Sequence, residues 1–314
     1  HLFKGETMYI YLAFALVGGF LLANQNPINA DLRKIVGSPF LASGISNFVG
    51  SIFLGIITLV TTQELFPSFQ FVSSHPAWLW IGGIFGGIFL TSNVLLFPRL
   101  GAVQTVILPI LGQILMGTLI DSFGWFHAMQ LPMTLMRFMG IVITLIGVII
   151  AVVLPNLKEK EAEKPKGNLL GWRIWAVIAG AMSAAQQAIN GRLGVLLENT
   201  AQAAFVSFLI GFLAIFIVSL FVDRRLPKIS DLKKAKPWNG IGGFLGASVV
   251  FATVVAVPQI GAGLTIMMGL IGQILGSMLV QQFGWWRSNK YQIQVWQVIG
   301  ILVMLAGIVF IKFL

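Results

Sequence analysis

Two pairs of amide side chains lie inside apolar stretches at the same spacing. Gln25 is followed by Asn29, and 161 residues later Gln186 is followed by Asn190. A spacing of four places both amides of a pair on one face of a helix. An amide buried in hydrocarbon without a partner is costly. Each pair is therefore a candidate for binding a polar ligand, for joining two helices, or for a simple polar helix end.

A second pair of amides occurs in a segment that the sequence contains twice. Residues 111–126 read LGQILMGTLIDSFGWF, and residues 271–286 read IGQILGSMLVQQFGWW. Gln113 and Gln273 each follow a glycine, which lets another backbone or a ligand come close. We expect these two glutamines to line a central cavity and bind substrate. The alternative is a helix–helix contact, which contributes about 0.6 kcal/mol in such settings.

Few other residues could take part in chemistry within the apolar stretches. No acidic residue lies in the middle of a predicted span, and Asp121, near the external end of the span 102–121, is the candidate for coupling transport to protons. The scarcity of acidic groups favours a neutral or zwitterionic substrate, or a facilitative mechanism. Pro27 and Pro109 interrupt helical hydrogen bonding and are candidate hinges, although kinks are also tolerated in membrane helices without a function.

Composition places the chain in a membrane. It has 314 residues, of which 57% are hydrophobic and 10% charged, against about 25% charged in soluble domains. The chain has no cysteine and no nucleotide-binding motif, catalytic triad or metal-ligand spacing, so we expect no enzyme activity, cofactor or metal. The net charge of +10 is explained by topology, and nucleic acid is not an expected partner.

The apolar runs predict an all-α membrane protein with ten transmembrane helices in two repeats. A first five-helix repeat occupies residues 8–154, a charged linker residues 155–171, and a second repeat residues 172–314; residues 1–7 precede the first methionine. Each span needs about 20 apolar residues. The ten spans are 8–29, 39–63, 78–97, 102–121, 136–154, 172–191, 201–222, 238–257, 262–282 and 296–313.

The halves align at offsets of 161 and then 160 residues, matching glycine, proline and polar positions as well as apolar ones. Because each half has an odd number of spans, the second half enters the membrane from the opposite side. Of the 20 basic residues, 16 fall on the side that holds the linker. Basic residues collect in cytoplasmic loops, so that side is predicted to be cytoplasmic and both termini to lie outside.

Inverted repeats around a midplane site are typical of secondary transporters. We therefore expect alternating-access transport of a small solute across the lipid bilayer. A lipid translocator and a membrane binding protein without transport are the alternatives, and a homodimer is left open.

Several stretches carry a resemblance to a known family. They are GGFLLANQNPINADLRKIVGSP (18–39), PRLGA (98–102), GQILMGTLIDSFGW (112–125) and the segment 137–147 that begins RFMGI. They are similar to the YdcZ-type family of bacterial membrane proteins, within the drug/metabolite transporter superfamily. The chain resembles the fused form, in which two antiparallel five-helix units are joined. The resemblance implies an exporter of metabolites or drugs in the bacterial inner membrane, but names no substrate.

Overall fold

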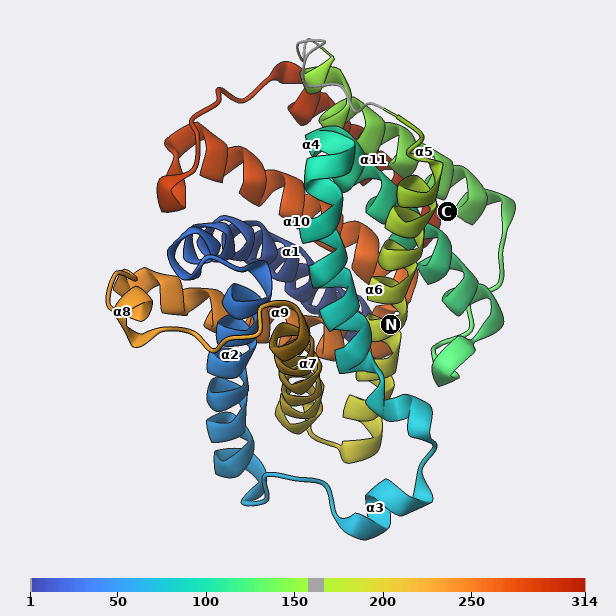
Figure 1. Ribbon diagram of the computed structural model, residues 1–314. Helices are drawn as coiled ribbons and strands as arrows, with labels where there is room; N and C mark the ends of the chain where they lie inside the picture. The colour runs from blue at the N-terminus through green and yellow to red at the C-terminus, as the bar shows by residue number, and fades with distance from the viewer. Residues whose placement is uncertain (1, 158–166, 314) are drawn as a thin grey trace.

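A computed structural model describes residues 2–157 and 167–313 of the chain, and helices make up nearly all of its regular structure. The gap, residues 158–166, falls within the predicted linker, so most of that linker lies outside the described residues. The α-helices, shown in Figure 1, are α1 (Leu2–Val36), α2 (Pro39–Thr62), α3 (Phe69–Ser74), α4 (Gly82–Phe123), α5 (Leu135–Val152), α6 (Leu170–Leu197), α7 (Thr200–Val222), α8 (Ile229–Leu232), α9 (Ile241–Ile260), α10 (Ala262–Phe283) and α11 (Val295–Phe313).

Eight stretches of these helices are long and apolar enough to cross a membrane. They are Glu6–Val36, Pro39–Thr62, Gln104–Phe123, Leu135–Asn156, Thr200–Val222, Pro237–Ile260, Ala262–Phe283 and Val295–Lys312. Two of the ten predicted spans do not reach this standard within the described residues. The predicted span 78–97 is represented by a shorter apolar helix, Gly82–Ser92. The predicted span 172–191 falls within α6, whose long helix carries several polar side chains.

One boundary differs from the sequence prediction, because the predicted spans 78–97 and 102–121 form the single 42-residue helix α4. Contacts with α6 require α4 to bend sharply. Gly86 of α4 packs against Gln186, and Gly112 packs against Val177 and Ala181. In a straight helix Gly86 and Gly112 would be about 39 Å apart, whereas their partners on α6 are within about 14 Å. The change of direction is visible in Figure 1.

In the second half, the stretch equivalent to α4 is divided into two separate helices, α9 and α10. Gly261 lies between α9 and α10 and has φ +86°, a conformation that favours glycine. The residue 160 positions earlier is also a glycine. The two halves thus make the same change of direction, with a helix break in one and a bent helix in the other.

Helices that occupy equivalent places in the two repeats pack against one another in antiparallel pairs. In α5 and α11, Gly140 meets Gly307 and Gly147 meets Gly300. In α2 and α7, the rings of Phe48 and Phe212 are 5.4 Å apart. Further along the same pair Gly55, nearer the end of α2, meets Phe205, nearer the start of α7. Glycine lets the backbones of α5 and α11 approach closely, as is common in membrane helix packing.

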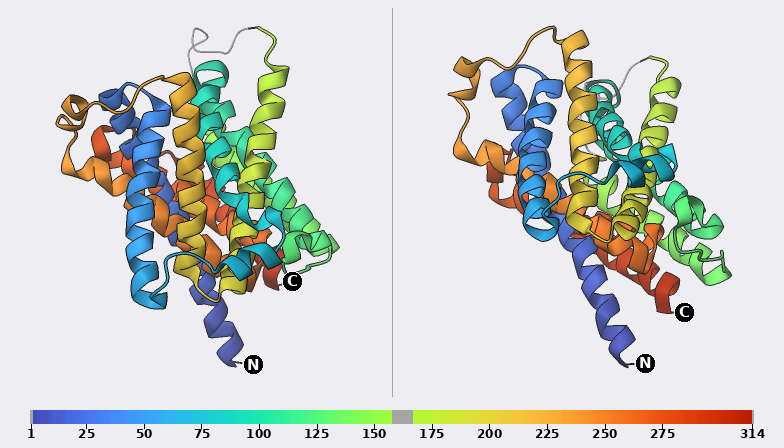
Figure 2. Two further views of the ribbon diagram at one scale, coloured as in Figure 1. Left: turned by 60° about the horizontal axis from the view of Figure 1, so that its bottom comes forward. Right: turned by 90° about the horizontal axis from the view of Figure 1, so that it is seen from below.

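The first helix of each repeat packs on the other repeat. Helix α1 lies against α9 and α10, and α6 lies against α4. Figure 2 shows the same bundle in two further views, the second of them from below. The largest apolar core lies among α1, α4, α10 and α11, and includes Ile114, Met267, Ile271 and Met304. Exposed apolar side chains cover the outer faces of α2, α5, α7 and α11, where lipid is the natural solvent.

Candidate functional site

The amides of α1 lie against glycines of α9. A Cβ atom added to Gly246 would overlap the Gln25 amide, and one added to Gly242 would lie 2.6 Å from Asn29 Oδ1. Gln25 and Asn29 are both half-buried. Two amides four residues apart on one helix therefore fit two glycines four residues apart on another. Only a residue without a Cβ leaves room for the amides there.

The same arrangement recurs between α6 and α4. Cβ atoms added to Gly86 and Gly82 would overlap the amides of Gln186 and Asn190. Asn190 is buried and Gln186 half-buried. We call these two places the amide–glycine seams: Gln25 and Asn29 on Gly246 and Gly242, and Gln186 and Asn190 on Gly86 and Gly82. Each seam joins one half of the chain to the other.

Gln113 and Gln273 lie beside a second kind of close approach. Gly112 meets the carbonyl of Val177 on α6, and Gly272 meets the carbonyl of Leu16 on α1. Both glutamines are half-buried, and no hydrogen bond joins their side chains to one another among the described residues. The structure places Gln113 next to the α4–α6 crossing and Gln273 next to the α1–α10 crossing. Their expected meeting across a central cavity stays a prediction.

The two prolines lie within continuous helices. α1 continues through Pro27, so the helix does not end at this proline. Pro109 is buried in α4, where its backbone meets Gly180 of α6. Its repeat equivalent, Gly269, meets Gly19 of α1 in the same way. Both crossings are tight packing contacts, and a hinge role for either proline stays a prediction.

Asp121 is fully buried and binds three groups. Its Oδ1 accepts a hydrogen bond from the backbone N–H of Ala262 at 2.8 Å, and its Oδ2 accepts one from Gly263 at 2.9 Å. Arg137 of α5 pairs with it at 3.4 Å. The carboxylate thus caps the N-terminus of α10, where negative charge is favourable. Asp121 holds α4, α5 and α10 together, and its proposed coupling role stays a prediction.

Four buried side-chain oxygens that have no hydrogen-bond partner among the described residues fall at repeat-equivalent positions. They are Asn29 Oδ1 with Asn190 Oδ1, and Ser46 Oγ with Ser207 Oγ. Ser46 and Ser207 lie on α2 and α7, and their backbone carbonyl oxygens lie against Gly243 and Gly83. Buried polar atoms are nearly always paired in proteins. At equivalent positions of the two halves, the seams and the serines beside them therefore offer oxygen atoms that can still accept a hydrogen bond.

Sequence reasoning missed a set of polar contacts at one end of the bundle. The buried carboxylate of Asp31 accepts a hydrogen bond from Asn239 Nδ2 at 3.0 Å and pairs with Arg287 at 3.6 Å. Ser38 Oγ donates to Asp223 at 2.6 Å. These contacts join the end of α1 to loops of the second half. The available signal was the opposite charge of Asp31 and Arg287 on the same predicted side of the membrane.

A family model described as "Putative inner membrane exporter, YdcZ" matches residues 10–150 and again residues 171–310. No curated protein matches the chain. A solved crystal structure of a protein superposes with a TM-score of 0.68 over 98% of this chain and 97% of the other, at 14% sequence identity, and shows a shared fold. Because the family model covers both halves of the chain, the protein belongs to the YdcZ-type family of inner membrane exporters, in the fused two-domain form.

Proposed function

We propose that this multi-pass inner membrane protein exports a small neutral or zwitterionic solute by secondary, alternating-access transport. In this proposal ten transmembrane segments form two inverted five-helix halves, residues 8–154 and 172–314, connected by the linker 155–171. The halves exchange conformations, so that an opening on one side implies a matching opening on the other.

The antiparallel helix pairs support the inverted arrangement. Gly140 aligns with Gly300 in the repeat, and Gly147 aligns with Gly307. In the structure Gly140 meets Gly307, and Gly147 meets Gly300. Exchanging each glycine for its repeat equivalent turns the contact Gly140–Gly307 into the contact Gly300–Gly147. A twofold axis exchanges contacts in this way. An axis relating two antiparallel membrane helices lies in the membrane plane, which is the geometry of inverted repeats.

The amide–glycine seams are the observation that carries the proposed binding site. Gln25 lies on Gly246 and, at the equivalent place, Gln186 lies on Gly86. No hydrogen bond to either glutamine side chain is found among the described residues, so an incoming solute that offers donors and acceptors could bind these amides without breaking a bond within the protein. Because no carboxylate lies in the seams, an uncharged or zwitterionic solute fits them better than an organic cation.

The two ends of the bundle are closed by different contacts. At one end Asp31 binds Asn239 and Arg287. At the other end Asp121 binds the start of α10, and Asn199 Nδ2 donates to Thr61 at 3.2 Å. Since no residue serves both ends, one end can open while the other stays closed. Separate closures are what alternating access requires.

A solute screen followed by transport tests the binding site. Purified protein is melted with a panel of uncharged and zwitterionic metabolites, because a bound ligand raises the melting temperature by mass action. A metabolite that does so is then used for counterflow in proteoliposomes. We expect Gln25→Ala and Gln186→Ala to lower counterflow at least tenfold, and Gln187→Ala, the neighbour on another helix face, to leave it near wild type. Equal counterflow in all three variants would refute the site.

Cysteine labelling tests the inverted arrangement independently. The natural chain has no cysteine, so single cysteines can be introduced without a background. We expect cysteines at Arg33 and Lys233 to react with a membrane-impermeant maleimide from the cytoplasmic side, and one at Gln130 to react from outside. Labelling of positions 33 and 233 from opposite sides would refute the arrangement whatever the transport result.

A further inference from the structure

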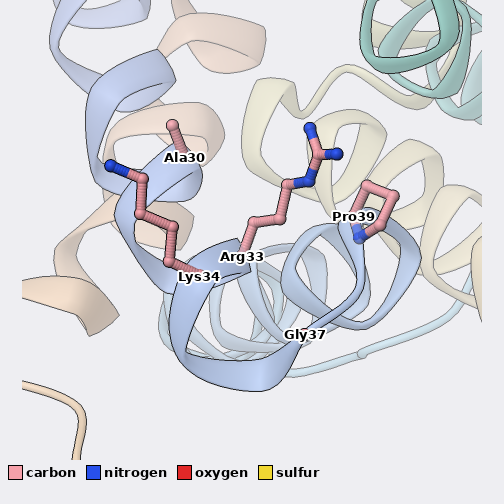
Figure 3. A pocket seen from close by; sticks show the side chains of 5 residues that line it. All are labelled: Ala30, Arg33, Lys34, Gly37 and Pro39. Atoms are coloured by element: carbon pink, nitrogen blue, oxygen red, sulfur yellow. The ribbon is translucent and has the colours of Figure 1, made fainter.

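A basic hollow of about 430 Å³ lies where α1 turns into α2. It is lined by Ala30, Arg33, Lys34, Gly37 and Pro39. Figure 3 shows Arg33 and Lys34 extending from the end of α1, with the guanidinium on the side of Pro39 and the amine on the side of Ala30. This hollow is separate from the amide–glycine seams and has no role in the proposed transport step.

The two cations of the hollow have no protein partner among the described residues. Arg33 and Lys34 are exposed, and neither side chain makes a hydrogen bond or an ion pair there. Asp31 pairs with Arg287 rather than with either cation. Asp223 accepts a hydrogen bond from Ser38, between the lining residues Gly37 and Pro39, so one carboxylate stands beside three cations and the hollow keeps a net positive charge.

A third cation borders the hollow from the second half of the chain. Arg225 Nη2 donates to the carbonyl of Val36 at 2.6 Å. It also lies 3.1 Å from the place where a Cβ atom on Gly37 would be, and Gly37 has φ +74°. The glycine both allows the turn and leaves room for the guanidinium. Arg225 is thus fixed at the edge of the hollow and adds to its positive potential.

Exposed apolar side chains follow Arg225 along the chain, outside the membrane-spanning helices. Leu226 follows Arg225 and is 57% exposed, and Ile229 at the start of α8 is 73% exposed. Helix α8 contacts α1 and lies beside its end in Figure 1. Cations next to exposed apolar groups are typical of a surface that sits in the headgroup region of a bilayer. A soluble inorganic anion would make no favourable contact with the apolar side chains of Leu226 and Ile229.

We propose that this hollow binds the headgroup of an anionic phospholipid from the leaflet on its side of the membrane. The phosphate lies between Arg33 and Lys34, with Arg33 able to donate two parallel hydrogen bonds to it. The acyl chains run past Leu226 and Ile229. Cations in the last turn also favour the helix dipole of α1, but that contribution does not depend on lipid, so a lipid readout separates the two roles.

Lipid binding to the purified full chain tests the proposal. Native mass spectrometry counts bound phosphatidylglycerol and phosphatidylcholine, and melting temperatures are measured with each lipid. A surface cation contributes about a fivefold gain in affinity for anionic lipid. We expect the double variant Arg33→Gln, Lys34→Gln to bind phosphatidylglycerol about 25-fold more weakly. The control Lys233→Gln, Lys290→Gln removes the same charge from exposed positions that do not line the hollow and should lose several-fold less affinity than the first pair.

Three outcomes would overturn the proposal. One is equal binding of phosphatidylglycerol and phosphatidylcholine to the wild-type chain, which needs no variant to fold. Another is an equal loss of binding in the control pair, which would indicate diffuse charge attraction. The third is displacement of the lipid by millimolar inorganic phosphate, which would identify a free anion as the ligand. The charge-preserving pair Arg33→Lys, Lys34→Arg should keep most of the affinity.

Discussion

Replacing Gly272 with alanine should destabilise the protein by about 2 kcal/mol. Gly272 of α10 crosses α1 so closely that an added Cβ atom would overlap the carbonyl oxygen of Leu16. It would also lie 2.9 Å from the carbonyl carbon of Leu16 and 3.0 Å from the nitrogen of Phe20. All three atoms belong to the backbone, so no side chain can rotate away. The two helices would have to separate.

The size of the effect follows from these distances. Non-bonded atoms pack best at about 3.5–4.0 Å. The overlap with the Leu16 carbonyl oxygen is the largest of the three, so α1 and α10 would need to move apart by more than about 1 Å. Overpacking of this kind costs about 1–3 kcal/mol, and a clash with backbone belongs at the upper end. The helix propensity of alanine over glycine returns about 1 kcal/mol. The net loss is about 2 kcal/mol, which corresponds to a melting temperature lower by about 3 °C for a chain of this length.

Two further glycines provide matched comparisons for the assay. Gly171→Ala adds the same methyl group where no atom lies within 4 Å, and should melt at or slightly above the wild-type temperature. Gly246→Ala meets the end of the flexible Gln25 side chain, which can move, so its melting temperature should fall less than that of Gly272→Ala. Melting is followed by tryptophan fluorescence in detergent. If Gly272→Ala melts like Gly171→Ala, the close crossing of α1 and α10 is wrong.

Three other substitutions test separate contacts. Asp121→Asn should lower the free energy of unfolding by about 3 kcal/mol, because it leaves the half-buried Arg137 without its counter-ion; a melting temperature equal to wild type would contradict this. Arg287→Gln should weaken the closure at the end of α1 and speed maleimide labelling of a cysteine at Asn29 several-fold, compared with the same cysteine alone; unchanged labelling would contradict the closure. Ser46→Ala should leave stability unchanged or raise it by up to about 1 kcal/mol, because it removes a buried hydroxyl with no partner; a marked loss of stability would indicate a hidden hydrogen bond.

Much of the site was predictable as a set of residues, but its contacts were not. The spacing of Gln25 and Asn29 indicated that both amides share a helix face, and they do pack on one neighbouring helix. Nothing in the spacing indicated that this neighbour is α9 of the other half, with Gly246 and Gly242 opposite the amides. The sequence contains many glycines in apolar runs, and only the relative placement of the halves selects these two.

The role of Asp121 illustrates the same limit. A lone carboxylate near the end of a membrane helix suggests proton coupling, because burying a charge is costly unless it has a function. In the structure the charge is compensated by Arg137 and by two backbone N–H groups of α10. The donors are backbone groups 141 and 142 residues away, so no motif in the sequence could point to them.

The sequence by itself determined the membrane class, the duplicated unit and the apolar segments, because these depend on composition and on the short-range periodicity of side chains. It also determined which positions are equivalent in the two halves. Only the tertiary structure decided that α1 packs on α9 and α10 while α6 packs on α4, that α4 bends without breaking, and that the amides rest on glycines. These features depend on how closely two backbones approach, and that distance is set by long-range packing, which neither helix encodes alone.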